Sequence, residues 1–319
     1  MTLSPLASLI VRRVGASLVT LLFVSLAVFG IAQLMEGDVA EAILGQSATP
    51  EALAGLRAAM HLDQPAWARY LDWATGVLTG DPGRSLITGL PVWEMIAARL
   101  GNSLTLAGLT ALVSVPFALL LGIVAAVKRG TAFDRAISIA TIGIVSVPEF
   151  LIATLAVMLF AVTLRWLPAL SSTRDVHSTW DLLRVFALPV FSLACFVMAQ
   201  MVRMTRAAVI DALDTSYAEA ARLKGCSPAR VVLRHALPNA VGPIANAIAL
   251  SLSTLLGGVI VVEIIFNYPG VARLMVDAVA TRDLPLVQTI AIIFCIAYLM
   301  LVTAADVVAI LANPRLRRR

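Results

Sequence analysis

Six apolar stretches, each long enough to cross a lipid bilayer as one helix, dominate this sequence of 319 residues. A helix needs about 20 predominantly apolar residues to span a hydrocarbon core of about 30 Å. The composition agrees with lipid as the main solvent, because only 13% of the residues are charged. The sequence therefore predicts an all-α membrane protein with six transmembrane helices. The predicted spans are Val14–Leu34, Ser103–Val127, Ala136–Leu164, Val185–Val202, Ala240–Val262 and Leu286–Leu311.

Four of these spans contain an internal proline, at Pro116, Pro148, Pro189 and Pro243. Proline removes a helical hydrogen bond, but membrane helices tolerate it where neighbouring groups satisfy the freed carbonyl. We therefore keep all four stretches as spans.

The first span is preceded by Arg12-Arg13, which resembles the start of a twin-arginine signal, and Ala40-x-Ala42 offers a small-residue cleavage pattern. The apolar core of a cleaved signal has about 7 to 15 residues. Because the run Val14–Leu34 is longer than that, we expect it to be a retained first helix.

The distribution of arginine and lysine predicts that both chain ends are cytoplasmic. With that orientation the inner segments hold 15 of the 24 basic residues and the outer segments hold 9, as the positive-inside rule requires. All five tryptophans then lie in outer segments, as expected for an interfacial aromatic belt. The net charge of +5 is therefore an orientation signal, and no nucleic-acid partner is expected.

The one long outer segment, residues 35–102, has the pattern of short helices. Thr49–Glu51 has an N-cap residue followed by proline at the first helical position. Trp67, Tyr70 and Trp73 are spaced to share one face of a second helix. Two interpretations stay open: a cap lying on the outer membrane surface, or a docking platform for an extracytoplasmic partner.

The cytoplasmic segment 203–238 has the pattern of a helix, a glycine turn and a second helix. Ser216–Glu219 has the form of a capping box and predicts a helix start at about Tyr217. Gly225 supplies a residue that tolerates positive φ, and Ser227-Pro228 predicts the second helix start. Such a hairpin suits insertion into a groove on a cytoplasmic partner. The alternative is a hairpin lying on anionic lipid, for which its basic residues are suited.

This segment resembles the EAA signature of the permease subunits of ABC importers, in which a Glu-Ala-Ala run precedes a glycine and later a Leu-Pro pair. His235 stands where the signature usually has isoleucine, as is familiar in the dipeptide, oligopeptide and nickel branch. The residues that match are Glu219, Ala220, Ala221, Gly225, Leu237 and Pro238. Further segments that resemble this branch are His61–Pro65, Gly80–Ser85, Glu263–Gly270 and Asn313–Arg315.

The resemblance implies a type I ABC-importer permease fold in a bacterial inner membrane and a pathway for peptides or related small solutes. It also implies a second, homologous permease, two cytoplasmic ATPases and an extracytoplasmic substrate-binding protein. The six matching residues would form the site that couples to an ATPase, and ATP would be bound by the partner subunits, with no cofactor in this chain. The expected organisation is a cytoplasmic N-terminus 1–13, a first span 14–34, an outer helical loop 35–102 and a core permease domain 103–319 that carries the coupling loop 203–238.

Three acids lie in or near the spans, where an ionised carboxylate needs water or a partner. Glu149 is the most interior and is a candidate for lining the translocation pathway; the alternative is an interhelical hydrogen bond or a contact with the second permease. Glu263 is a second pathway candidate at the outer end of its span, as part of a gate or as an anchor for the following loop. Asp306, near the inner end of the last span, is expected to form a structural ion pair.

No catalytic or metal-binding motif is present. Neither lysine lies in a Walker A loop, and the cysteines and histidines lack zinc-site spacing. We therefore expect a non-enzymatic, non-metal permease. The alternative function is a secondary transporter driven by an ion gradient, with Glu149 as its ion site, and a membrane-anchored receptor is a weaker third.

Overall fold

The computed structural model describes most of the chain as helix. Two of the motif segments quoted above reach beyond it, since His61, Leu62 and residues 313–315 lie outside the described residues. The described residues are 5–34, 40, 44, 49–59, 63–171 and 178–312.

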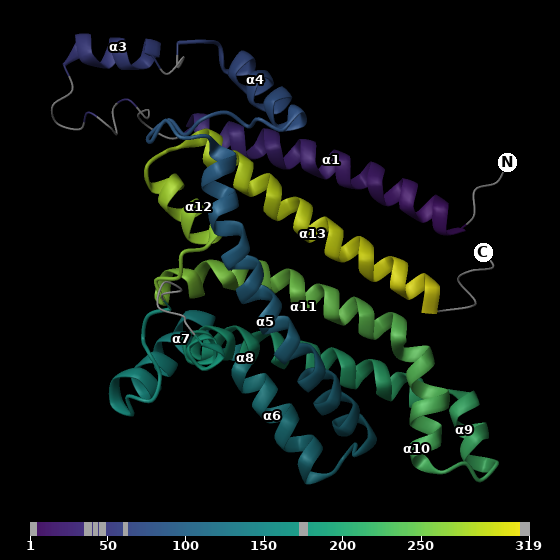
Figure 1. Ribbon diagram of the computed structural model, residues 1–319. Coiled ribbons are helices and arrows are strands. Elements are labelled where there is room, and N and C mark those ends of the chain that lie inside the picture. Colours follow the sequence, from purple (N-terminus) through teal and green to yellow (C-terminus); the bar gives the residue numbers. More distant parts are fainter. Residues whose placement is uncertain are drawn as a thin grey trace. The chain divides into compact units, whose positions relative to one another are not determined.

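The described helices follow one another along the chain with short connections (Figure 1). Several are far longer than a typical globular helix of about 11 to 12 residues, as membrane spans must be. The described α-helices, long and short, are α1 (Pro5–Leu34), α3 (Pro50–Ala59), α4 (Ala66–Thr79), α5 (Val92–Val127), α6 (Ala132–Ser146), α7 (Glu149–Ala156), α8 (Thr179–Leu213), α9 (Ser216–Leu223), α10 (Pro228–Arg230), α11 (Leu237–Ile265), α12 (Val271–Ala280) and α13 (Leu284–Ala312).

The number of spans agrees with the sequence prediction once a broken helix is counted as one span. Within the described residues, five helical segments are long and apolar enough to cross a membrane, and the pair α6 and α7 makes a sixth if taken together.

The chain divides into two compact units. Unit 1 consists of Met1–Gly15, Thr105–Tyr268 and Tyr298–Arg319, and unit 2 of Ala16–Leu104 and Pro269–Ala297.

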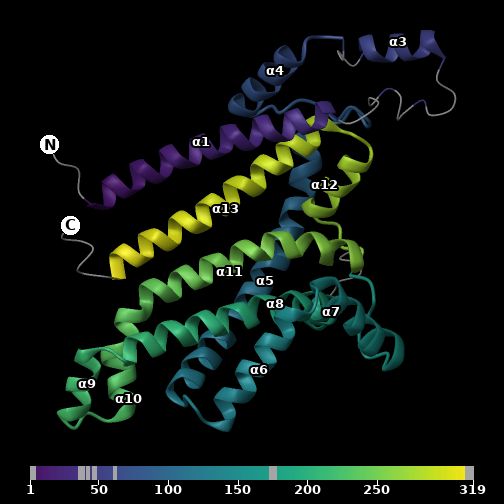
Figure 2. The same cartoon turned by 180° about the vertical axis from the view of Figure 1, so that it is seen from behind.

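In unit 1, α8 and α11 lie side by side, as the two opposite views show (Figures 1 and 2). Helices α6 and α7 both pack against α8, and α7 also contacts α11. At one end of the α8–α11 pair, α9 and α10 form a short hairpin (Figure 2). The long helices therefore form a base from which the hairpin projects.

The predicted third span, Ala136–Leu164, is not one straight helix. Helix α6 ends at Ser146, α7 begins at Glu149, and the two axes meet at 100°. Val147 is extended, with φ −96° and ψ 130°, because the residue before a proline is disfavoured in the helical region. Pro148 thus breaks the span, whereas Pro116, Pro189 and Pro243 lie inside continuous helices.

Several helices extend beyond the predicted spans, and α5 and α8 do so by the most residues. Helix α5 begins at Val92 rather than Ser103, and α8 runs from Thr179 to Leu213 rather than from Val185 to Val202. Charged residues mark the end of an apolar run, but they do not end a helix when their side chains reach water or a partner. The predicted cytoplasmic loop 203–238 therefore starts with the last turns of α8, which ends at Leu213.

Helices α5 and α8 cross closely at Gly122. A Cβ built on Gly122 would lie 2.8 Å from the Cβ of Thr205 and 3.0 Å from the carbonyl oxygen of Val202. Small residues allow membrane helices to approach in this way. Gly122 therefore fixes the spacing between these two spans.

Unit 2 has its own apolar core, formed by the first turns of α5, helix α12 and the start of α13. Val92, Ile96, Val271 and Ile290 are among its fully buried side chains. The loop that precedes α5 is attached to α13 by Asp283, which accepts hydrogen bonds from the Ser85 hydroxyl and, at 3.1 Å, from the Leu86 backbone N–H.

The short helices of the outer segment form where the sequence predicts them. The hydroxyl of Thr49 accepts a hydrogen bond from the Ala52 backbone at 3.2 Å, so the N-cap of α3 is confirmed. In α4, Tyr70 and Trp73 pack with ring centroids 6.0 Å apart. The prediction that Trp67 shares their face is wrong: a separation of six residues turns Trp73 away from Trp67, which is exposed.

Candidate functional site

The hairpin between α8 and α11 contains the residues of the EAA-like signature. Helix α9 begins at Ser216, close to the predicted start, but the predicted capping box is absent, because Thr215 occupies the N-cap position and no side chain caps the helix. The Thr215 hydroxyl instead donates to the Ala212 carbonyl at 2.7 Å. This bond ties the start of α9 to the end of α8.

Gly225 makes the turn of the hairpin, as its position in the sequence predicts. Its φ of 78° lies in the left-handed region that glycine adopts without strain. Its N–H donates to the Arg222 carbonyl at 2.9 Å, and the next N–H, of Cys226, donates to the Ala221 carbonyl at 3.1 Å. This pair of bonds is the Schellman arrangement that ends a helix and turns the chain sharply.

The two predicted signature alanines lie on different faces of α9. Ala221, with Ala218, is buried against the ends of α5 and α8 and against the returning chain at Val231 and Ala236. Ala220 is exposed, as is Glu219 beside it. One face of α9 therefore holds the hairpin on its base, and the other faces outward.

The outward part of the hairpin includes apolar side chains. Leu223 is 84% exposed, and Tyr217 and Leu233 are also exposed. Basic residues surround them at Arg222, Lys224, Arg230 and Arg234, all of which are exposed. A small exposed surface that mixes leucine, tyrosine and arginine is suited to a protein interface.

The returning arm begins as the sequence predicts and then departs from an ordinary α-helix. Ser227 is the N-cap residue and Pro228 occupies the first helical position of α10. The next six residues, Val231–Ala236, form a wider π-helical segment that leads into α11. Leu237 and Pro238 then start α11, with Leu237 half-buried in the hairpin core and Pro238 exposed.

Glu149 is the first residue of α7, at the break made by Pro148. Its carboxylate lies against Gly258 of α11, and a Cβ at that position would overlap both carboxylate oxygens. Among the described residues Glu149 forms no ion pair or side-chain hydrogen bond. An acid without a partner in an apolar span is a candidate functional group.

Glu263, the other predicted pathway acid, has no exposed surface. Its backbone carbonyl accepts from the Tyr268 N–H at 2.8 Å, and Tyr268 is fully buried against the Phe186 ring, with centroids 5.6 Å apart. Burial, with a smaller contribution from the Glu263 carboxylate, raises the pKa of the Tyr268 phenol above its ordinary value. Glu263 thus lies under the loop that follows α11.

The amino-acid sequence of this chain matches a known protein family over most of its length. Residues 118–318 match the family described as binding-protein-dependent transport system inner membrane component, and residues 6–107 match the N-terminal part of such membrane components. The chain belongs to this family.

Relatives over the full length of this permease include three proteins. A probable peptide ABC transporter permease of Sinorhizobium fredii is 33% identical over 97% of this chain and 98% of its own length. A putative peptide transport system permease of Brucella abortus is 36% identical over 98% and 99%. The glutathione transport system permease GsiC of Salmonella typhimurium is 36% identical over 97% and 98%.

Membership of the family confirms three predictions. The chain is a multi-pass component of a bacterial inner membrane, with an all-α permease fold. It is a transport component and not an enzyme. The relatives are named as ABC transport permeases, which supports the ATP-driven importer over the ion-gradient alternative.

The third intramembrane acid of this permease forms the predicted ion pair. Asp306 of α13 pairs with Arg13 of α1. Because Arg13 lies nearly 300 positions earlier in the sequence, local spacing gave no indication of this partner.

A second charged contact in the permease was not predicted at all. Asp134 of α6 and Arg206 of α8 form a largely buried ion pair. The two residues lie in different predicted segments, and only the packing of α6 on α8 brings them together. In the described part of the permease, no cluster of three or more histidine, cysteine, aspartate or glutamate side chains is arranged to hold a metal ion.

Proposed function

We propose that this chain is the permease subunit of an ATP-driven importer of peptides or related small solutes. The proposed partners are a homologous second permease, two cytoplasmic ATPases and an extracytoplasmic binding protein, with membrane lipid around the spans. The names of the peptide and glutathione permease relatives support the solute class. The family description, which specifies dependence on a binding protein, supports the extracytoplasmic partner.

We propose that both chain ends and the α9–α10 hairpin are cytoplasmic. The excess of arginine and lysine in the predicted inner segments supports this orientation. It also places the hairpin on the side of the membrane where ATP is available.

The observation that carries the coupling role is the division of α9 into two faces. Buried Ala218 and Ala221 hold the hairpin on the ends of α5 and α8, while Ala220 and Glu219 face outward. A surface that is exposed and yet rigidly attached can receive a force and transmit it. In this proposal Glu219, Ala220, Ala221, Gly225, Leu237 and Pro238 form the ATPase-coupling site, with Ala221, Gly225 and Leu237 shaping the hairpin.

The mechanism follows from how the hairpin is attached. ATP is bound by the partner ATPases, whose closure displaces the outward face of α9. Because the hairpin core is continuous with α8 and α11, the displacement is transmitted to these long helices as a rigid-body movement. The bundle then changes between outward-facing and inward-facing states.

We propose that Glu149 faces the translocation pathway and that its carboxylate contacts the ammonium group of a passing peptide. Its position at the break of a span and the lack of a partner among the described residues support this role. Glu263, which is fully buried, serves in this proposal as the anchor of the loop at the outer end of the pathway.

The test is uptake by the reconstituted importer. The chain, its second permease, the ATPases and the binding protein are placed in liposomes, and uptake of a labelled dipeptide is measured with ATP and without an ion gradient. ATP-dependent uptake that requires the binding protein is expected. Uptake by this chain alone, driven by a proton or sodium gradient, would overturn the proposal.

A further inference from the structure

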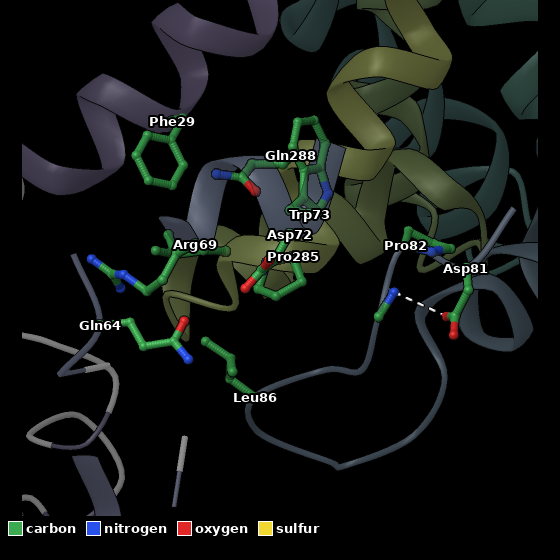
Figure 3. A pocket seen from close by; sticks show the side chains of 12 residues that line it. Phe29, Gln64, Arg69, Asp72, Trp73, Asp81, Pro82, Leu86, Pro285 and Gln288 are labelled. Carbon is green, nitrogen blue, oxygen red and sulfur yellow. Dashed lines mark hydrogen bonds between the residues drawn. The ribbon is translucent and has the colours of Figure 1, made fainter. Parts of the chain in front are cut away.

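Unit 2 contains a cavity of about 320 Å³ that the coupling mechanism does not use. Figure 3 shows Phe29 from α1, Arg69 and Asp72 from α4, and Gln288 from α13 around it. The cavity lies where the first span ends and the last span begins. Because the ends of membrane spans lie near the boundary between lipid and water, we expect the cavity at that level.

Two hydrogen-bond donors that line this cavity have no acceptor among the described residues. Gln288 is 3% exposed, and in the described part of the chain its Nε2 has no hydrogen-bond partner. The Nε of Arg69 is also buried without a partner there, although its terminal nitrogen donates to the Gln33 carboxamide at 2.6 Å. Buried donors without acceptors cost free energy. A ligand with an acidic oxygen in this cavity would satisfy both.

A carboxylate lines the same cavity. Asp72 lies one helical turn after Arg69, so the two side chains project from the same face of α4. The Asp72 carboxylate forms no ion pair or hydrogen bond with the other described residues, and only its backbone carbonyl accepts a bond, from the Thr75 hydroxyl at 3.1 Å. The cavity therefore presents a carboxylate beside the two donors, and a ligand with an ammonium group close to its acidic group matches this arrangement.

The walls of the cavity are fixed to one another before any ligand arrives. The Trp73 indole N–H donates to the Thr289 hydroxyl at 3.2 Å and joins α4 to α13. The hydroxyls of Tyr70 and Ser25 lie 2.8 Å apart and join α4 to α1. Such preorganisation lowers the entropic cost of binding. The volume is near the lower end of ligand pockets, which measure about 300 to 1,000 Å³.

We propose that this cavity binds a zwitterion, whose acidic oxygen accepts from Arg69 Nε and Gln288 Nε2 and whose ammonium group lies against Asp72. Two sources carry these groups: the phosphoethanolamine headgroup of a membrane lipid, and a free peptide. The proposed site is separate from the coupling hairpin and does not depend on the solute that the importer carries.

The test is ligand retention by the full-length purified chain, measured by native mass spectrometry. One arm supplies phosphatidylethanolamine in mixed micelles, with phosphatidylglycerol, which lacks the ammonium group, as its reference. The other arm supplies dialanine, with acetylated dialanine as its reference. Retention of either zwitterion over its reference is expected and identifies the source; retention of neither, or equal retention of a reference, would overturn the proposal.

Variants assign the binding to this cavity. Asp72→Asn changes an exposed side chain and cannot unfold the core, and it should lower the retention of the zwitterion by about tenfold, as expected for a loss of about 1.4 kcal/mol. Gln288→Leu should also lower the retention of the zwitterion, because it removes a hydrogen-bond donor. Thermal melting checks that this variant is folded. Arg273→Gln on α12, outside the cavity, is the control and should leave retention unchanged. Unchanged retention in Asp72→Asn would contradict the assigned site.

Discussion

Arg206 of α8 holds Asp134 of α6 by two parallel hydrogen bonds. The Arg206 Nε lies 2.6 Å from one carboxylate oxygen, and a terminal nitrogen lies 2.9 Å from the other. The Gly130 N–H also donates to Asp134 at 2.9 Å, so the carboxylate joins the turn before α6 to α8. Two-bond arginine–carboxylate pairs are among the stronger polar contacts in proteins.

Asp134→Asn should therefore destabilise the permease. The Asp134 side chain is 5% exposed and that of Arg206 is 28% exposed, so the loss should be on the order of 2 kcal/mol, below the ~3–5 kcal/mol of a fully buried pair. Thermal unfolding of the purified protein in detergent measures it. The control is Asp214→Asn, which breaks a pair with Arg129 whose side chains are 59% and 58% exposed and should cost under about 1 kcal/mol. Equal losses in the two variants would contradict this account.

Gly122→Ala should destabilise the contact between α5 and α8, because the new methyl group meets Thr205 and the Val202 carbonyl. Overpacking costs about 1–3 kcal/mol. Gly108→Ala, on the same helix with open space around it, isolates the helix-propensity gain of about 1 kcal/mol. In thermal unfolding, the melting temperature of Gly108→Ala should be higher than that of the wild type, and the melting temperature of Gly122→Ala should be lower. The reverse order would show that the two helices do not cross at Gly122.

Asp283→Ala should release the loop before α5 from the start of α13. The change removes the acceptor for the Ser85 hydroxyl and the Leu86 N–H, and an unsatisfied buried donor costs about 1–3 kcal/mol. Limited proteolysis should then cut the loop near Arg84 faster than in the wild type. Asp277→Ala, which removes a more exposed carboxylate on α12, should leave the cleavage rate unchanged. A loop that is cut at the same rate in all three proteins would contradict the role of Asp283.

Glu149→Gln should lower uptake of peptides that carry a free amino group while leaving the fold intact, since the side-chain volume is kept. Gly258→Ala should have a similar effect by displacing the carboxylate, whereas Gly257→Ala, which has open space, should be near wild type. Uptake by the reconstituted importer, compared for free and N-acetylated peptides, measures this. An equal loss for both peptides in Glu149→Gln would point to a structural role instead.

Local sequence patterns were sufficient for much of the fold. The apolar runs located the spans, and Gly225 and Pro228 located the hairpin turn and its returning arm, because each depends on the residue itself and its immediate neighbours. The end of α8 was predicted too early for a related reason. Hydropathy marks the end of the apolar run at Val202, but α8 continues to Leu213. The charged residue Arg206 is accommodated in this last part of the helix because it pairs with Asp134.

Contacts between distant segments were not predictable from one sequence. Asp134 with Arg206 and Ser85 with Asp283 depend on which helices are neighbours, and no local spacing encodes that. The same holds for the site residues. The sequence placed Ala220 and Ala221 in one motif, but only the packing of α9 shows that Ala221 is buried and Ala220 faces outward.

That difference between neighbouring alanines predicts opposite effects of one substitution. Ala221→Leu should disrupt the buried base of the hairpin and lower its thermal stability, by about 1–3 kcal/mol for overpacking. Ala220→Leu should leave stability unchanged and still abolish ATP-driven uptake, because it adds bulk only to the outward face. Paired melting and uptake measurements separate the two. Full uptake in a stable Ala220→Leu protein would contradict the docking role of that face.

The most direct measurement of the coupling claim is a cross-link from the outward face of α9. A cysteine is placed at Ala220 after Cys195, Cys226 and Cys295 are changed to serine, and the assembled importer is treated with a short thiol cross-linker that reacts with lysine. A covalent product between this chain and an ATPase subunit is expected from Ala220→Cys, and none from Leu78→Cys, which is exposed on α4. If the Ala220→Cys chain assembles and transports but gives no such product, α9 does not contact the ATPase and the coupling account is wrong.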